Sequence, residues 1–202
     1  MGGGSSAAAV VLAAGESRRV GEQKLLLPFG RSTVIGSVVA ALEAAGADPI
    51  IVVGGAQAEQ IAGALAETRA RVVQNPHPER GMLPSLRVGV GALHAGVQRF
   101  LIALGDQPRL TSGDVTRVLA AQAEARKGIA IACYRGKRGH PVVFDGRYRD
   151  GILSLSDEQT LRDLIHAHPE DVVNVECESD GVVRDIDTRE DYEAERARAD
   201  GT

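Results

Sequence analysis

Residues 10–28 of this chain, VVLAAGESRRVGEQKLLLP, decide the fold class. The stretch opens with an unbroken apolar run, which is typical of a strand buried on both faces of a parallel sheet. The chain then turns at Gly15 and carries three cations, Arg18, Arg19 and Lys24. A glycine turn leaves backbone N–H groups free for an anion, and guanidinium groups suit phosphate oxygens. The alternative is a solvated loop whose cations offset its own glutamates, and composition alone weighs the two equally.

Apolar runs and helical patterns alternate outward from this stretch. We predict strands near Ala8–Ala13, Pro49–Val53, Val72–Gln74, Phe100–Leu104, Ile129–Cys133, Pro141–Phe144 and Val172–Val175. We predict helices near Thr33–Ala45, Ala58–Thr68, Pro84–His94, Ser112–Arg126, Thr160–Ala167 and Arg189–Ala199. This alternation indicates an α/β fold with a mostly parallel sheet and helices on both faces. In the C-terminal part, RGKRGHPVVFDG reads as a loop followed by a strand that pairs antiparallel.

Composition narrows the function classes. At 202 residues the chain suits one domain over residues 1–202, with residues 1–6 as a flexible leader. A net charge of −4 and 3% aromatic residues argue against a nucleic-acid partner, which needs a basic field or stacking side chains. No apolar run reaches membrane-spanning length, so no membrane partner is expected. Cys133 and Cys177 stand without C-x-x-C neighbours, which favours a reducing cytoplasm.

Two polar stretches follow predicted strands: the cationic loop after the first strand, and GDQPRL after Phe100–Leu104. Because ligands of a doubly wound sheet bind outside the carboxyl ends of its strands, we expect the two stretches to be neighbours. Asp106 then faces a triphosphate site, where Mg²⁺ takes one or two carboxylates plus substrate phosphates. A turn or helix-capping role is the alternative for this aspartate.

Two further stretches carry polar side chains with open interpretations. In RDIDTRED, Asp187 and Thr188 are typical of a helix cap. A metal-binding role for Asp187, which is compatible with the cap, and a weaker one for Asp185 are implied only by the resemblance given below. The stretch RGKRGHPVVF gathers Arg135, Lys137, Arg138 and His140 around two glycines. It reads as a solvated hairpin or as a pocket for a phosphate.

Together these stretches carry a resemblance. LAAGESRRVGEQKLL resembles the signature L-A-A-G-x-S-x-R-M-G-x-x-K-L-L of nucleotidyltransferases with a GT-A-like, Rossmann-related fold, and most of all that of the molybdenum cofactor cytidylyltransferases, a MobA-like family. NPHPERGMLPSLRVGV, GDQPRL, RGHPVVF and DIDTREDY follow in the order that the family shows, so the resemblance spans nearly the whole chain. Val20 departs from the family's Met, which is a conservative apolar change.

The resemblance implies a role for each matched residue. The nucleotide would be bound by Leu12, Ala13, Ala14, Gly15, Arg19, Lys24, Asn75, Gly81, Ser85 and Asp106. Lys24, Arg19 and Asp106 would be catalytic, Asp106 and Asp187 would bind Mg²⁺, and Arg138 and His140 would bind the acceptor. Arg18 matches a variable position of the signature. The sequence LAAG, where related guanylyltransferases show LAGG, implies CTP rather than GTP.

The implied reaction transfers CMP from CTP to a phosphate of molybdopterin cofactor and releases pyrophosphate, with a molybdoenzyme or its maturation factor as protein partner. A phosphate acceptor is already ionised near neutrality, so charge neutralisation and positioning suffice. Three alternatives stay open. One is GTP or another phosphorylated acceptor, another is a nicotinamide-dependent oxidoreductase, and the last is a non-catalytic delivery partner. The lack of G-x-G-x-x-G weighs against the oxidoreductase, and retention of Lys24, Asp106 and Asp187 weighs against the delivery partner.

Overall fold

The computed structural model describes residues 6–15 and 23–200 of the chain. Arg18 and Arg19 of the cationic loop lie outside the described residues, as does the predicted leader except for Ser6. Among the described residues, no helix is both long and apolar enough to cross a membrane.

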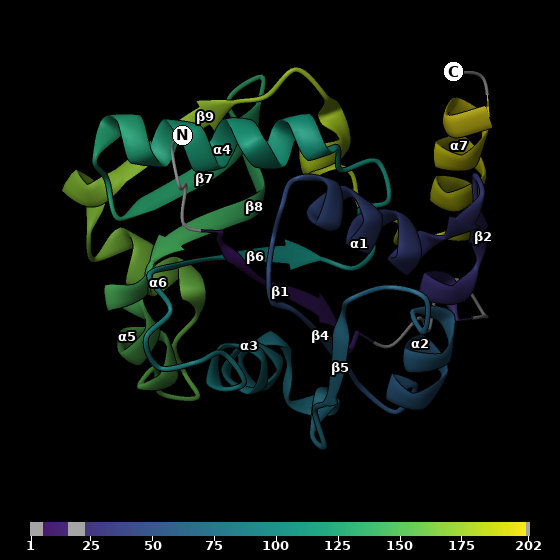
Figure 1. Ribbon diagram of the computed structural model, residues 1–202, viewed down its shortest axis with the longest axis horizontal. Coiled ribbons are helices and arrows are strands. Elements are labelled where there is room, and N and C mark those ends of the chain that lie inside the picture. Colours follow the sequence, from purple (N-terminus) through teal and green to yellow (C-terminus); the bar gives the residue numbers. More distant parts are fainter. Residues whose placement is uncertain (1–5, 16–22, 201–202) are drawn as a thin grey trace.

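A seven-stranded sheet of order β5-β4-β1-β6-β8-β7-β9 runs through the molecule (Figure 1). Its strands are β1 (Ala8–Ala13), β4 (Ile50–Gly54), β5 (Arg71–Gln74), β6 (Arg99–Leu104), β7 (Ile129–Tyr134), β8 (Lys137–Asp145) and β9 (Val172–Glu176). β1 pairs parallel with both β4 and β6. β8 alone runs antiparallel, between β6 and β7. All seven predicted strands are therefore present, and the fold is the expected mostly parallel, Rossmann-like one.

Helices cover both faces of this sheet (Figure 1). They are α1 (Val34–Ala44), α2 (Ala58–Ala64), α3 (Met82–Gly91), α4 (Ser112–Ala125), α5 (Arg149–Leu153), α6 (Leu161–His166) and α7 (Arg189–Asp200). Shorter elements are the hairpin β2 (Pro28–Phe29) and β3 (Ser32–Thr33), and the 3-10 turns η1 (Lys24–Leu26), η2 (Pro78–Arg80), η3 (Gly146–Tyr148), η4 (Pro169–Asp171) and η5 (Asp180–Val183). Helix α5 and the small hairpin were not predicted, because each is too short to show a period.

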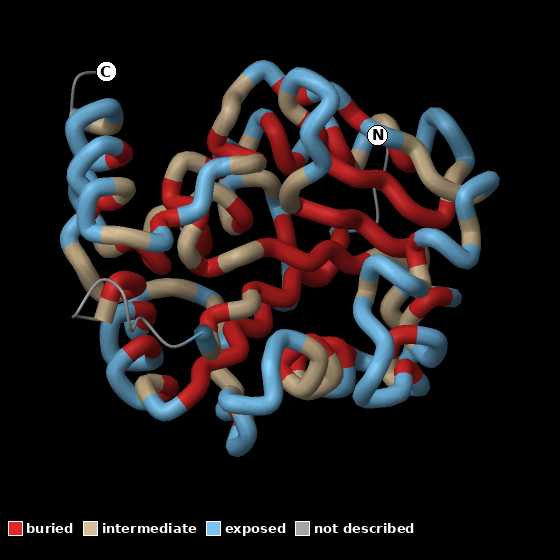
Figure 2. Tube along the Cα trace, turned by 180° about the vertical axis from the view of Figure 1, so that it is seen from behind, coloured by how far each residue is buried: buried red, intermediate tan, exposed pale blue. Residues whose placement is uncertain are grey.

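The alternating side chains of β1 divide the core into two apolar clusters. Val11 and its neighbours pack with residues of α1 and α4, whereas Val10 packs with residues of α3, α5 and α6. The strands at the centre of the sheet are accordingly buried along their length, while the helices are buried on their inner sides only (Figure 2). Helix α3 approaches so closely that a Cβ on Gly89 would lie 2.3 Å from the Val10 side chain.

The C-terminal hairpin departs from the prediction of a loop before the antiparallel strand. β8 begins at Lys137, and its pairing with β7 matches Tyr134 to Lys137 and Cys133 to Arg138. Only Arg135 and Gly136 remain in the turn, with φ angles of 49° and 77°. Two central residues with positive φ make a tight hairpin turn whose twist matches that of the strands. The polar residues after this turn are thus part of the sheet.

Candidate active site

The carboxyl end of β1 lies in the middle of the sheet, between the ends of β4 and β6. Leu12, Ala13, Ala14 and Gly15, the predicted nucleotide-lining residues, occupy this position. The neighbouring strand ends approach closely, since Gly105 N–H donates to the Leu12 carbonyl at 2.9 Å and a Cβ on Gly105 would lie 3.2 Å from that of Ala13. Ala13 is itself buried, whereas Gly15 is exposed at the end of the strand. The small side chains of these residues therefore allow the ends of β1 and β6 to approach each other closely.

Lys24 is held at the same edge by the turn η1. The side chain of the next residue, Leu25, is buried in the core, and the Tyr192 hydroxyl of α7 donates to the Pro28 carbonyl at 2.7 Å. Residues from both ends of the chain thus fix the backbone around Lys24. The Lys24 side chain is only 11% exposed, so its ammonium requires partners.

Those partners are two of the predicted functional carboxylates. Lys24 Nζ donates to Asp106 Oδ2 at 2.7 Å and lies 3.6 Å from Asp187 Oδ1. It also donates to the backbone carbonyl of Ile186 at 2.6 Å. We call Lys24, Asp106 and Asp187 the Lys24 cluster. The two aspartates, 81 positions apart in the sequence, thus converge on a single ammonium group.

Backbone contacts explain this convergence. Ile186 N–H donates to the Asp106 carbonyl at 3.0 Å, which ties the segment before α7 to the end of β6. Helix α7 then starts with Thr188 and Asp191, whose side chains and backbone N–H groups exchange hydrogen bonds in the manner of a capping box. Because Thr188 and Asp191 form the cap, the Asp187 carboxylate is left free to face Lys24. The two roles considered for this stretch coexist.

Burial raises the pKa of Asp106, and the nearby charge of Asp185 adds to the rise. The Lys24 ammonium opposes both effects by stabilising the charged carboxylate. Asp187 is not among the causes of this rise. The contact with Lys24 therefore favours the charged form of a carboxylate that lies in a poorly hydrated place.

The same cluster fits a divalent cation by its donor chemistry. Asp106 and Asp187 offer oxygen atoms that already face one positive charge, with side chains 21% and 56% exposed. Among the described residues, no group of three or more His, Cys, Asp or Glu side chains forms a complete metal cage. Two carboxylates at an open edge match Mg²⁺, which takes few protein ligands and fills the rest with water and substrate phosphates.

A second predicted group, Asn75, Gly81 and Ser85, lies at the same edge of the sheet, beyond β4. Asn75 follows β5, is buried, and donates from Nδ2 to the Ser85 hydroxyl at 2.9 Å. Its Oδ1 accepts from His77 N–H at 2.9 Å, which shapes the loop into α3. Gly81 precedes α3 with φ of 93°, a backbone conformation that favours glycine. Asn75 and Ser85 therefore satisfy each other and fix this loop, while Gly81 gives it its turn.

The predicted acceptor residues, Arg138 and His140, lie on the other side of β6, in β8. Arg138 is exposed, and its Nε donates to Asn174 Oδ1 at 2.8 Å. Burial lowers the pKa of His140 to about 4, so the imidazole is neutral at pH 7. His140 can therefore donate or accept a hydrogen bond there but brings no positive charge.

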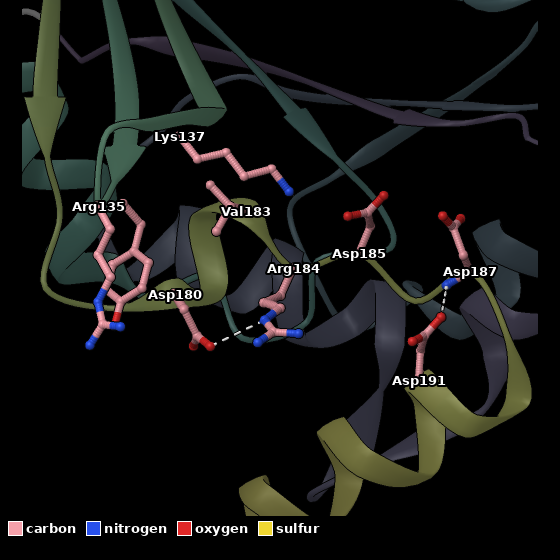
Figure 3. A pocket seen from close by; sticks show the side chains of 9 residues that line it. Arg135, Lys137, Asp180, Val183, Arg184, Asp185, Asp187 and Asp191 are labelled. Atoms are coloured by element: carbon pink, nitrogen blue, oxygen red, sulfur yellow. Dashed lines mark hydrogen bonds and ion pairs between the residues drawn. The ribbon is translucent and has the colours of Figure 1, made fainter.

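Next to the Lys24 cluster is an open pocket of about 480 Å³ (Figure 3). Its basic lining residues are Arg135, Lys137 and Arg184, and its acidic ones are Asp180, Asp185, Asp187 and Asp191. Neither Arg138 nor His140 lines it. Lys137 lines the pocket and Arg138 does not, because the side chains of consecutive residues in a strand point to opposite faces of the sheet. Sequence reasoning had noted Lys137 but not singled it out, and the two-residue turn Arg135–Gly136 is the signal that could have placed its side chain.

Residues 9–172 match the model of the MobA-like NTP transferase domain. The chain is 30% identical over 188 residues to nicotine blue oxidoreductase of Paenarthrobacter nicotinovorans, covering 89% of this chain and 91% of that protein. It is 25% identical over 182 residues to molybdenum cofactor cytidylyltransferase of Escherichia coli, covering 89% and 90%.

Solved structures are also similar to this chain over nearly its whole length. A nucleotidyl transferase from Methanothermobacter superposes with a TM-score of 0.81 at 29% identity, covering 97% of this chain and 98% of that one. A Mycobacterium tuberculosis protein solved in complex with manganese superposes with a TM-score of 0.76 at 28% identity, covering 95% and 98%. One structural neighbour of the chain was thus solved with a divalent metal.

Proposed function

The chain belongs to the MobA-like NTP transferase family, and from that premise we propose that it transfers CMP from CTP to a phosphate of a molybdopterin-type cofactor. Pyrophosphate is the other product, and Mg²⁺ is the metal. The observation that carries the proposal is the Lys24 cluster, in which Lys24, Asp106 and Asp187 meet at the carboxyl edge of the sheet. That arrangement joins a cation for phosphate oxygens to two carboxylates for a metal ion.

In this proposal the reaction depends on positioning and charge. Asp106 and Asp187 would hold Mg²⁺, which would supply positive charge to neutralise phosphate charge in the transition state. Lys24 would exchange its contacts with the carboxylates for contacts with the triphosphate. The family resemblance assigns the role of a second cation to Arg19, which is outside the described residues. The acceptor phosphate is already ionised near neutrality, so no strong base is required. The neutral imidazole of His140 is compatible with a hydrogen-bonding role only.

The other predicted residues take the following roles in this proposal. Leu12, Ala13, Ala14 and Gly15, at the carboxyl end of β1, bind the nucleotide, and the loop shaped by Asn75, Gly81 and Ser85 receives the base. Arg138 and His140 belong to the acceptor side of β6. The assignment of CTP rather than GTP rests on the resemblance of LAAG to the cytidylyltransferases and on the 25% identical E. coli enzyme of that name.

We place the enzyme in the cytoplasm, with a molybdoenzyme or its maturation factor as partner. Cys133 and Cys177 are both free and buried. Burial raises the pKa of both thiols, that of Cys177 to about 11, so they stay protonated at neutral pH. Two unreactive thiols that form no disulfide support a reducing compartment.

A second candidate function follows from the name of the 30% identical relative, nicotine blue oxidoreductase. An oxidoreductase on this scaffold would bind a nicotinamide nucleotide where we place CTP. The two carboxylates around Lys24 favour the transferase, because hydride transfer does not require a metal between them.

The two functions are separated by one set of assays. Pyrophosphate release is measured with each of the four nucleoside triphosphates and Mg²⁺, with and without molybdenum cofactor, and oxidation of NADH and NADPH is followed in parallel. We expect release with CTP that depends on the cofactor. Pyrophosphate release with GTP would mean that GTP is the nucleotide substrate. Release with another phosphorylated acceptor would mean that this acceptor replaces the molybdenum cofactor in the proposal. Nicotinamide oxidation without pyrophosphate release would replace the transferase by the oxidoreductase.

A further inference from the structure

The open pocket beside the Lys24 cluster contains one cation that the protein itself does not use. Lys137 is exposed at the start of β8, and its side chain makes no hydrogen bond or ion pair with any other residue that the structure describes. Its side chain extends from the hairpin toward the segment that carries Val183 and Asp185 (Figure 3). A lysine that lines a pocket without a partner is available to a ligand.

The other charged groups of the pocket are largely engaged. Asp180 is paired with Arg109 at 2.9 Å and with Arg184 at 3.3 Å. Asp191 accepts the N–H and hydroxyl of Thr188 at the start of α7. These residues build the wall of the pocket and have little charge left to offer.

The arginine next to the hairpin turn is also engaged. The guanidinium of Arg135 lies over the Tyr134 ring, 5.3 Å from its centroid, and in Figure 3 it points away from Asp185. Its backbone N–H donates to Glu176. Arg135 therefore forms the outer rim, and Lys137 is the cation that faces inward.

The position of Lys137 relative to the acidic residues defines the ligand. Asp185 and Asp187 line the pocket on the side of the Lys24 cluster, and the Lys137 side chain extends toward Asp185 (Figure 3). Resting on the proposed function, in which the Lys24 cluster binds the metal and the nucleotide, we propose that Lys137 binds the phosphate monoester of the acceptor. A compact ammonium suits a phosphate dianion, and a phosphate bound there lies beside the Lys24 cluster.

This assignment differs from the one that the sequence favoured. Arg138 is the next residue of the same strand, but its side chain is on the other face, where it bonds Asn174. Lys137 and Arg138 are thus adjacent cations that can be compared directly, because Lys137 lines the pocket and Arg138 does not.

The experiment measures phosphate binding separately from turnover. Inorganic phosphate is titrated by calorimetry into protein whose nucleotide site is filled with Mg²⁺ and a non-hydrolysable α,β-methylene analogue of CTP. The variants are Lys137→Gln, Lys137→Arg and Arg138→Gln. Lys127→Gln is the matched control, because Lys127 precedes β7 at the opposite edge of the sheet and its side chain donates to the Glu170 carbonyl.

We expect Lys137→Gln to weaken phosphate binding about tenfold, as loss of one charge-assisted hydrogen bond does, with Lys137→Arg in between and Lys127→Gln unchanged. In turnover the same variant should raise the KM for the acceptor with little change in kcat or in CTP binding. Phosphate binding that Lys137→Gln leaves intact, or that is lost only in Arg138→Gln, overturns the assignment. Wild-type protein that binds no phosphate under these conditions overturns it as well.

The experiments distinguish a failure of the Lys137 assignment from a failure of the proposed function. If phosphate binding depends on Lys137 but no acceptor yields pyrophosphate, the pocket is a phosphate site and the transferase reaction is wrong. If pyrophosphate is released but Lys137→Gln behaves as wild type, the reaction stands and the Lys137 assignment fails.

Discussion

The two lysines at the carboxyl edge of the sheet, Lys24 and Lys137, have opposite surroundings. Lys24 is 11% exposed and bonded to Asp106 and to the Ile186 carbonyl, whereas Lys137 is exposed and contacts no charged partner among the described residues. A lysine that is already paired contributes to stability and must exchange partners before it binds a ligand. A lysine without partners affects only what it binds. In the proposed function, this difference means that the nucleotide end is preorganised by the fold and that the acceptor end is completed by its ligand.

The largest effect is expected at the paired end. Asp106→Asn removes the charge and keeps the shape, so transfer should fall on the order of 10²–10³-fold or below detection, while the fold is retained. Pyrophosphate release under saturating substrates checks the rate, and circular dichroism checks the fold. Full activity of a folded Asp106→Asn protein would remove Asp106 from the metal site.

A double-mutant cycle of Asp106 and Asp187 tests whether the two carboxylates bind the same metal ion. Asp187→Asn should lower the rate in the same way, less completely if Asp185 substitutes for it. The double variant Asp106→Asn/Asp187→Asn should lose far less than the product of the two single losses, because either change already disables a shared ion. Rates for the four proteins complete the cycle. Multiplicative losses would mean that the two aspartates act independently.

Replacing Lys24 tests whether its ammonium group neutralises the charge of the carboxylates when no substrate is bound. Lys24→Met leaves the poorly hydrated Asp106 carboxylate without its partner, so the free energy of unfolding should fall by about 1–3 kcal/mol. Mn²⁺ without nucleotide should restore stability, since it can take the place of the ammonium between Asp106 and Asp187. Urea unfolding with and without Mn²⁺ measures both. The Lys24 cluster is not an ionic unit if Lys24→Met is as stable as wild type.

The smallest effect concerns the acceptor side, where His140 is neutral. Its pKa in the folded protein is about 4, below the ordinary value of 6.5, so the unfolded chain binds the proton first as pH falls. The stabilising contribution is complete above about pH 6.5 and is lost progressively down to about pH 4. Between pH 7 and 5 wild type should lose about 1–2 kcal/mol more than His140→Gln in urea unfolding. Equal losses in the two proteins would show that the imidazole titrates normally.

Much of the fold follows from the sequence, because the strands are apolar runs and the helices have clear periods. The runs around Val10 and Ile102 predicted two strands of a mostly parallel sheet, and the Gly, Pro and Asp signals between elements marked their ends. The start of β8 was missed since the polar residues Lys137–His140 show no apolar pattern, and only pairing with β7 makes them a strand. Helix α5 was missed because its five residues include Gly151.

The proximity of Lys24, Asp106 and Asp187 was predictable from the sequence, whereas their individual contacts were not. The motifs around Lys24, Asp106 and Asp187 suggested a common location, because strand ends share one edge of a parallel sheet. The bond from Lys24 to the Ile186 carbonyl is a tertiary contact between opposite ends of the chain, which no local pattern encodes. The face to which Lys137 points depends on the register of a hairpin, and a shift of one residue would have placed Arg138 in the pocket instead.

The most direct test of the account is metal binding at the Lys24 cluster. Mn²⁺ binding is measured by electron paramagnetic resonance with the α,β-methylene analogue of CTP present, for wild type, Asp106→Asn and the control Lys127→Gln. We predict that wild type and Lys127→Gln bind Mn²⁺ alike and that Asp106→Asn binds about tenfold more weakly or not at all, because one of two carboxylate ligands has lost its charge. Binding of Mn²⁺ and nucleotide that is unchanged in Asp106→Asn would contradict the account.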